Sequence, residues 1–160
     1  MTEVKQSPCV IRDATRDDID TIVAFNAAMA EETEGKTLDR EILRNGVRGA
    51  FESTSGAHYF LAETDGEIAG QLMTTSEWSD WRNGMFWWIQ SVFIAQPFRR
   101  QGVFSALYEH VRNKALNTPG VCGIRLYVFH ENERAIETYR KLGMVVTDYK
   151  LCEEEFDARA

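Results

Sequence analysis

Two arginines and a glycine stand where an apolar strand gives way to a helix, in the segment 89–107. The strand ends at Pro97, and Arg99, Arg100 and Gly102 follow directly before the predicted helix. The first N–H groups of a helix lack partners, and the helix dipole adds partial positive charge there. Because Gly102 has no side chain, an anion can approach the backbone, and the guanidinium groups add formal charge. The pattern predicts a compact phosphate or pyrophosphate site.

Two common phosphate-binding motifs do not fit this turn. A Walker A loop needs an earlier glycine and a Lys-Ser/Thr pair, and the dinucleotide fingerprint needs three glycines. The turn has neither pattern. A pair of surface arginines beside a turn glycine is the alternative interpretation, and local chemistry alone leaves it open.

The turn resembles a motif of the GNAT superfamily of acetyl-CoA-dependent N-acetyltransferases. The family motif, Arg/Gln-x-x-Gly-x-Gly/Ala after the fourth strand, reads here Arg99-Arg100-Gln101-Gly102-Val103-Phe104. The second family motif, an asparagine followed by a tyrosine and a glycine, reads NERAIETYRKLGM (132–144). Both motifs fall on the expected elements at the expected separation. Phe104 departs from the pattern, since the family most often has a small residue there, and it either crowds the loop or points into the core.

The resemblance implies acetyl-CoA as cosubstrate and assigns residues to it. The pyrophosphate would rest on the turn, and the pantetheine arm would bond to the backbone of the fourth strand. Asn132 would bond the pantetheine end, although a plain helix N-cap explains this residue equally well. The cofactor-binding residues are then Val92, Phe93, Ile94, Arg99, Arg100, Gln101, Gly102, Val103, Phe104, Ser105 and Asn132.

Amine attack on a thioester needs proton transfers. An alkyl amine of pKa about 10.4 is about one part in 2,500 neutral at pH 7, a deficit of roughly 4.6 kcal/mol. Tyr139 matches the family tyrosine that commonly protonates the departing thiolate; packing between helix and sheet is its alternative role. Many relatives carry Glu where this chain has Gln90, and a neutral amide is no base. A base must therefore come from elsewhere or act through water.

Carboxylates and tryptophans supply further candidates for the acceptor side. A cluster of carboxylates would favour a cationic substrate, and tryptophans in a connection could wall a pocket for an organic cation. Solvated carboxylates and hairpin packing are the simpler explanations. With Gln90, the candidate substrate-binding residues are Glu32, Glu34, Glu77, Trp78, Asp80 and Trp81; Glu31 is a further candidate base.

The elements that must position these groups follow a mixed α/β order. Apolar patterning and turn signals predict strands at 10–11, 58–63, 67–76, 86–95, 123–129 and 144–151. Four helices are predicted, the first capped by Thr15 and Asp18 and the others following Gly35, Gly102 and Asn132. The second carries one apolar face, formed by Leu38, Ile42, Leu43, Val47 and Phe51. The resemblance implies one domain over 1–160, with about four helices flanking a mostly antiparallel sheet of about six to seven strands that splays between strands 4 and 5.

Composition narrows the class of protein. The chain has 160 residues and a net charge of −7, which argues against a broad nucleic-acid-binding surface. No apolar run is long enough to cross a bilayer, and the start, MTEVKQSP, lacks the features of a secretory signal. Cys9, Cys122 and Cys152 share no metal-type spacing with histidines. We expect a cytoplasmic protein that binds no metal, nucleic acid or membrane, and the resemblance permits a homodimer.

Two functions from different classes fit the sequence. The first is an N-acetyltransferase that moves acetyl from acetyl-CoA to a primary amine of a small molecule or polypeptide. The second is a catalytically weak acyl-CoA-binding regulatory module, which Gln90 in place of an acid suggests. Fold-level coincidence, with another phosphate in the basic turn, is a third interpretation.

Overall fold

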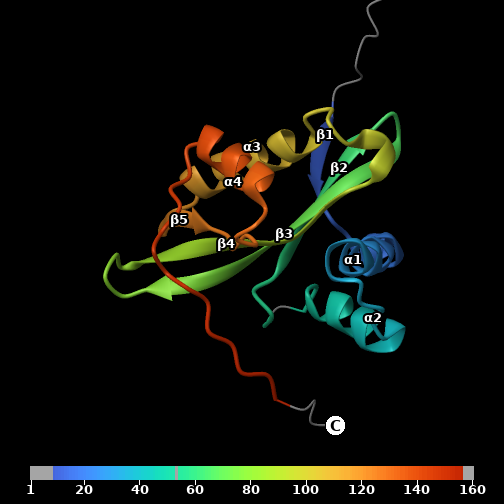
Figure 1. Ribbon diagram of the computed structural model, residues 1–160, viewed down its shortest axis with the longest axis horizontal. Coiled ribbons are helices and arrows are strands. Elements are labelled where there is room, and N and C mark those ends of the chain that lie inside the picture. The colour runs from blue at the N-terminus through green and yellow to red at the C-terminus, as the bar shows by residue number, and fades with distance from the viewer. Residues whose placement is uncertain (1–8, 53, 157–160) are drawn as a thin grey trace, which may run out of the picture. The chain divides into compact units, whose positions relative to one another are not determined.

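The computed structural model describes residues 9–52 and 54–156. The chain forms two compact units, one ending at Leu126 and the other beginning at Tyr127. The first unit contains a five-stranded sheet in the order β1-β2-β3-β4-β5 (Figure 1). Its strands are β1 (Val10–Asp13), β2 (His58–Thr64), β3 (Glu67–Ser79), β4 (Gly84–Ile94) and β5 (Val121–Arg125). All neighbouring pairs are antiparallel except β4 and β5, which are parallel.

Helices cover both faces of this sheet, and β2 shows why. Tyr59 and Leu61 of β2 pack with Ile22 and Val23 of α1 (Ile19–Glu34). Phe60, between them, faces α3 (Val103–Leu116), since its ring lies 5.5 Å from that of His110. Successive side chains of a strand point to opposite faces, so α1 and α3 lie on opposite sides of the sheet. An unbroken apolar run is typical of such a strand.

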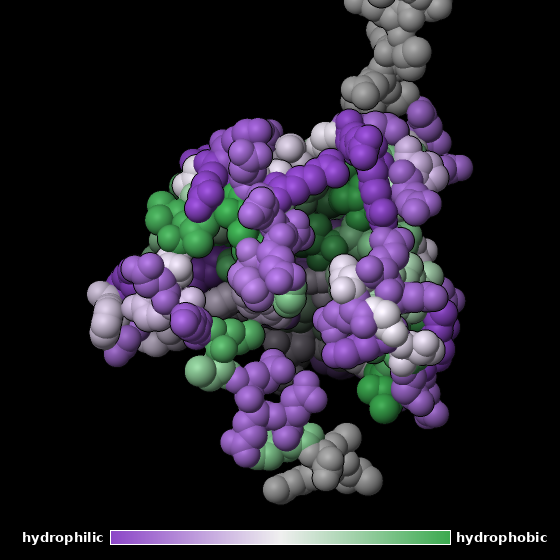
Figure 2. Space-filling model, viewed as in Figure 1, coloured by the Kyte–Doolittle hydropathy of each residue, from purple (hydrophilic) through white to green (hydrophobic). Residues whose placement is uncertain are grey.

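The second helix, α2 (Arg40–Gly49), is capped by Asp39, whose Oδ1 accepts hydrogen bonds from the N–H groups of Glu41 and Ile42. Its buried residue is Val47, as predicted, and Leu43 packs beside it. Placing Ile42 on this face was wrong: its side chain is 68% exposed, and Figure 2 shows an apolar patch over α2. Ile42 precedes Val47 by five residues, about 140° around the helix, so the two cannot share a face.

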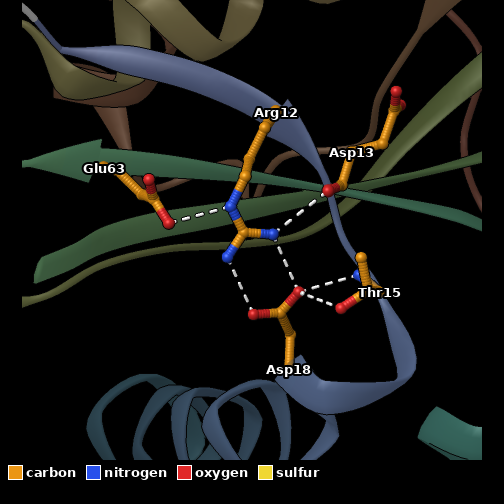
Figure 3. A network of polar contacts seen from close by, with 5 residues as sticks. All are labelled: Arg12, Asp13, Thr15, Asp18 and Glu63. Carbon is orange, nitrogen blue, oxygen red and sulfur yellow. Dashed lines mark hydrogen bonds and ion pairs between the residues drawn. The ribbon is translucent and has the colours of Figure 1, made fainter. Parts of the chain in front are cut away.

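An arginine network fixes the start of α1 against the sheet (Figure 3). Arg12 of β1 donates from Nη1 and Nη2 to the two carboxylate oxygens of Asp18, each at 2.8 Å, and from Nε to Glu63 of β2 at 2.8 Å. The N–H of Thr15 donates to Asp18 at 2.7 Å, which confirms the predicted pairing of these two residues. These bonds to the carboxylate lower the pKa of Asp18 to about 2.

The second unit contains α4 (Glu133–Lys141), which the sequence predicts from Asn132 onward. The strand predicted at 144–151 is absent, and the one predicted at 123–129 ends at Arg125. Tyr127 and Val145 are 59% and 83% exposed. A strand forms only where a neighbour pairs with its backbone, which apolar patterning does not guarantee. The six to seven predicted strands are therefore not confirmed; the described residues form five.

No helix in the described part of the chain has the length and apolar character needed to span a membrane.

Candidate functional site

A bulge interrupts β4 next to its free end. Gln71 of β3 lies opposite Phe93, and Met73 lies opposite Gln90. One residue of β3 therefore faces Ser91 and Val92 together. Ser91 has a φ of 50°, which is uncommon for a residue with a side chain. The sequence carries no glycine here, so the usual local signal of such a bulge is missing.

The pairing of β4 with β5 ends well before β4 does. The last paired residues are Trp88 and Arg125, and β4 continues to Ile94. Ala95 donates its N–H to Ala69 of β3 at 2.9 Å, so the backbone groups of Ile94 point to the other edge. The carbonyl of Val92 points the same way, because it lies opposite the N–H of Phe93 across a planar trans peptide and Phe93 faces β3. Past Trp88, β4 thus presents polar backbone on the edge where the resemblance places a splay.

Phe93, also predicted to contribute backbone groups, occupies a different environment. Its register opposite Gln71 directs its backbone toward β3. Its ring is 8% exposed and lies 5.1 Å from the ring of Phe25 of α1. Phe93 packs the end of β4 against α1.

The basic turn leads from β4 into α3 through a short 3-10 helix, Gln96–Phe98. Arg100 and Gly102 both adopt left-handed backbone, with φ of 64° and 79°. Left-handed residues in turns expose successive N–H groups, which can bind an anion. Nothing lies within 4 Å of where a Gly102 Cβ would sit, so conformation explains this glycine.

The N-terminus of α3 has no side-chain cap. The first helical bond runs from the N–H of Ala106 to the carbonyl of Gly102 at 3.0 Å. The N–H groups of Val103, Phe104 and Ser105, which lie before Ala106, therefore have no acceptor within the helix. The turn itself is closed by Gln101, which donates from Nε2 to the carbonyl of Pro97 at 2.8 Å. This arrangement is that of an anion site.

The two arginines of the turn differ in their surroundings. Arg99 donates from Nε to the carbonyl of Ile94 at 2.8 Å and from Nη2 to Glu32 at 2.7 Å. Its guanidinium also lies 5.5 Å from the centre of the Phe93 ring. Arg100 is exposed, and no acceptor in the described chain binds its side chain. Arg99 therefore fixes the turn, and the guanidinium of Arg100 is available to an anion.

The residues that open α3 show what Phe104 does. Val103 is 4% exposed and packs in the core, while Ser105 is half-buried. Phe104 is also half-buried, and its ring centre lies 6.2 Å from that of Tyr108 on the same helix. Phe104 thus lies along α3 beside Tyr108, and the fully buried side chain of this turn is that of Val103.

In the second unit, Asn132 caps α4. Its Oδ1 accepts a hydrogen bond from the N–H of Ala135 at 3.1 Å, which is the simpler of the two predicted roles. Tyr139 is half-buried in this helix, and burial raises the pKa of its phenol. The phenol is therefore protonated at neutral pH.

The candidate carboxylates do not come together as one cluster. Glu32 pairs with Arg99 beyond the end of β4, whereas Glu77 pairs with Arg125 opposite the start of β4. β4 has 11 residues, so its two ends are about 33 Å apart. Glu34 pairs with Lys36 at 2.6 Å, and Asp80 accepts the N–H of Trp81 at 2.9 Å.

The predicted tryptophans lie at the end of the β3–β4 hairpin. Trp78 is 58% exposed and Trp81 is 85% exposed. Gln90 lies further along β4 and donates from Nε2 to the hydroxyl of Thr75 at 2.7 Å. Neither tryptophan lines a described cavity.

Comparison with known proteins shows the family to which the chain belongs. The model of the acetyltransferase (GNAT) family matches residues 20–144, and the chain belongs to that family. It is 41% identical to a possible acetyltransferase from Clostridium difficile 630, with a TM-score of 0.86 over 94% of this chain and 99% of that chain.

Two curated relatives carry related names. An N-alpha-acetyltransferase of Sulfolobus acidocaldarius is 28% identical over 142 residues, covering 83% of this chain and 77% of the relative. A probable N-acetyltransferase of Drosophila melanogaster is 33% identical over 63 residues, covering 39% of this chain. That match spans 34% of the Drosophila protein.

Proposed function

We propose that this chain transfers the acetyl group of acetyl-CoA to a primary amine of a small molecule or polypeptide, by direct attack of the amine on the thioester. One observation supports this most strongly. The free edge of β4 beyond Trp88 leads directly through the turn to the uncapped start of α3. A long ligand with a diphosphate at one end and amides along its arm fits this sequence of groups.

Different residues of the chain bind different parts of the ligand. The guanidinium of Arg100 and the first N–H groups of α3 bind the pyrophosphate. The backbone groups of Val92 and the N–H of Ile94 bind the amides of the arm, because the carbonyl of Ile94 already accepts from Arg99. The family resemblance assigns the far end of the arm to Asn132, and the side-chain N–H2 group is the one that would serve, because Oδ1 already caps α4. When bound, acetyl-CoA supplies an activated acetyl group.

Tyr139 acts as the proton donor to the departing thiolate. The thiolate of an ordinary thiol, whose pKa is about 8.5, departs more readily when a nearby acid donates a proton to it. Burial raises the pKa of Tyr139, so this phenol retains its proton throughout the neutral range.

The acceptor we favour is an α-amino group, as at the N-terminus of a polypeptide. Gln90 is no base, and Glu32 and Glu77 are occupied by arginines. An α-amine of pKa about 8 is about one part in ten neutral at pH 7, compared with about one part in 2,500 for a lysine side chain. An α-amine therefore needs much less help from a base. The name of the Sulfolobus relative points the same way.

A CoA-release assay with a panel of amines tests this proposal. The panel contains a short peptide with a free N-terminus, its N-acetylated form with a free lysine, a polyamine and an amino sugar. We expect the free α-amine to give the highest kcat/KM at pH 7, and the blocked peptide to give at least tenfold less. Failure of every amine to release CoA would overturn the enzymatic function.

An acyl-CoA-binding module is the second candidate, and the neutral Gln90, bonded to Thr75, favours it. It predicts saturable CoA binding by calorimetry without amine-dependent thiol release. Any amine-dependent release excludes it.

A further inference from the structure

A chain of buried amides connects α1 to the bulge of β4. Gln71 of β3 is fully buried and donates from Nε2 to the backbone carbonyl of Ser91 at 3.1 Å. The same Nε2 donates to Oδ1 of Asn26 on α1 at 2.7 Å. Asn26, 6% exposed, donates in turn to the hydroxyl of Tyr59 at 3.2 Å. These hydrogen bonds therefore connect four elements, α1, β2, β3 and β4, and end at the residue that makes the bulge.

The direction of these bonds is fixed by chemistry. A backbone carbonyl only accepts, so the group of Gln71 that faces Ser91 must be its N–H2. That orientation leaves Oε1 of Gln71 buried, with no partner among the residues the structure describes. A buried polar atom without a partner is destabilising. An apolar side chain would avoid that cost but would leave Oδ1 of Asn26 and the carbonyl of Ser91 without this donor, so the glutamine is explained by its N–H2 group.

The bulge needs such a tether. Ser91 holds a left-handed φ of 50°, which a residue with a side chain adopts at a cost in free energy. On the other side of β3, Gly70 leaves room for β4, since a Cβ there would lie 2.9 Å from the carbonyl oxygen of Phe93. β3 thus sets the path of β4 at two adjacent residues, through a missing side chain and through the Gln71 amide.

We infer that Gln71, oriented by Asn26, is a positioning residue for acetyl-CoA binding: by holding the carbonyl of Ser91 it fixes the bulge and so the direction of the Val92 and Ile94 backbone groups. This inference rests on the proposed function. Gln71 lies beneath β4 on the side of α1, so it acts through the strand and does not touch the ligand.

The test compares Gln71→Met with the wild-type protein. Methionine keeps the length of the side chain but removes both the donor and the partnerless oxygen. We expect the Kd for CoA to rise about tenfold, the loss of one positioning hydrogen bond. We also expect hydrogen exchange at the amides of residues 91–94 to accelerate in the ligand-free protein. The midpoint of thermal unfolding should fall, because the variant leaves Oδ1 of Asn26 and the carbonyl of Ser91 without this donor, although one partnerless oxygen leaves with the side chain.

Two further variants make the test specific. Asn26→Leu leaves the Gln71–Ser91 bond without its orienting partner, and should raise the Kd by about threefold. Thr64→Val is the control: Thr64 Oγ1 is the other partnerless buried side-chain atom in the described chain, at the β2–β3 turn. Thr64→Val should leave both the Kd and the exchange of residues 91–94 unchanged.

Different results contradict the two proposals. A folded Gln71→Met with wild-type Kd and wild-type exchange at residues 91–94 would overturn the positioning role, while CoA binding by the wild type would keep the proposed function. A wild type that binds no CoA would overturn both.

If Gln71→Met does not fold, Gln71→Glu takes its place. Its carboxylate cannot donate to Ser91 near pH 8, but its protonated form can. The Kd should then fall back toward the wild-type value as the pH decreases to 5, and an unchanged Kd ratio would contradict the inference.

Discussion

Arg99 and Glu32 form an ion pair of 2.7 Å that connects the turn after β4 with the last turn of α1. The same arginine binds the carbonyl of Ile94, so one side chain joins the end of the strand, the turn and the helix. Arg99, which the motif assigns to the phosphate, therefore holds the turn in shape. Arg100, its neighbour, is the arginine that we assign to the ligand.

Breaking this ion pair tests whether Arg99 holds the turn in shape or binds the phosphate. Glu32→Gln should raise the KM for acetyl-CoA by about threefold, since a partly exposed pair contributes at most about 1 kcal/mol. Glu41→Gln, at an exposed residue of α2, is the control and should change nothing. A lower KM in Glu32→Gln would show that Arg99, once released, binds the phosphate better than it holds the turn.

Arg100→Ala should raise the KM for acetyl-CoA by at least tenfold, with a smaller change in kcat. A charge-assisted hydrogen bond to a phosphate contributes about 1.5–3 kcal/mol. Steady-state kinetics with acetyl-CoA as the varied substrate measures this, and Arg48→Ala on the surface of α2 is the control. An unchanged KM would remove Arg100 from the binding site.

Much of this arrangement follows from local signals in the sequence. The apolar run that buries both faces of β2, the turn at Pro97 and the start of α3 after Gly102 all lie within short stretches, where backbone sterics and local residue patterns decide the outcome. These signals also predicted the strand that ends at Ile94 and, after it, the basic turn that we propose as the phosphate site.

The parts that could not be predicted depend on partners distant in the sequence. The bulge of β4 has its Ser91 carbonyl bonded by Gln71, which is itself bonded to Asn26, and no local pattern in the sequence announces contacts between residues so far apart. An amide at an apolar position, as at Asn26 and Gln71, is the one available signal. Glu32 and Glu77 were grouped by charge, but the length of β4 places them at opposite ends.

Tyr139→Phe should lower kcat by about 100-fold and leave the KM for acetyl-CoA nearly unchanged, as expected for loss of a general acid. Because burial raises the pKa of this phenol, wild-type kcat should show no loss from Tyr139 ionisation up to about pH 10. Tyr149→Phe, at a tyrosine that is 83% exposed, is the control. A kcat within twofold of the wild type would exclude Tyr139 as the acid.

Asp18→Asn should lower the free energy of unfolding at pH 7 by about 2 kcal/mol, because the folded state lowers the pKa of Asp18 from 3.8 to about 2. A lowered folded-state pKa stabilises the protein above the unfolded value, and this stabilisation disappears as the pH falls from about 4 to about 2. The difference between wild type and variant in urea unfolding should shrink over that range.

The neighbouring Asp17→Asn is the matched control for Asp18→Asn, since Asp17 is exposed and has no described partner. It should change the free energy of unfolding by less than about 0.5 kcal/mol. A difference between Asp18→Asn and the wild type that stays constant from pH 7 to pH 2 would contradict the role of the Arg12–Asp18 network.

The most direct measurement is calorimetric titration of the wild-type protein with CoA, combined with amide hydrogen exchange at saturation. We predict one-to-one binding that weakens in Arg100→Ala, with exchange slowed at Val92, Ile94 and residues 103–105. The absence of saturable heat up to about 1 mM CoA, equivalent to a binding free energy weaker than about −4 kcal/mol, would contradict the assignment of β4 and the basic turn to this ligand.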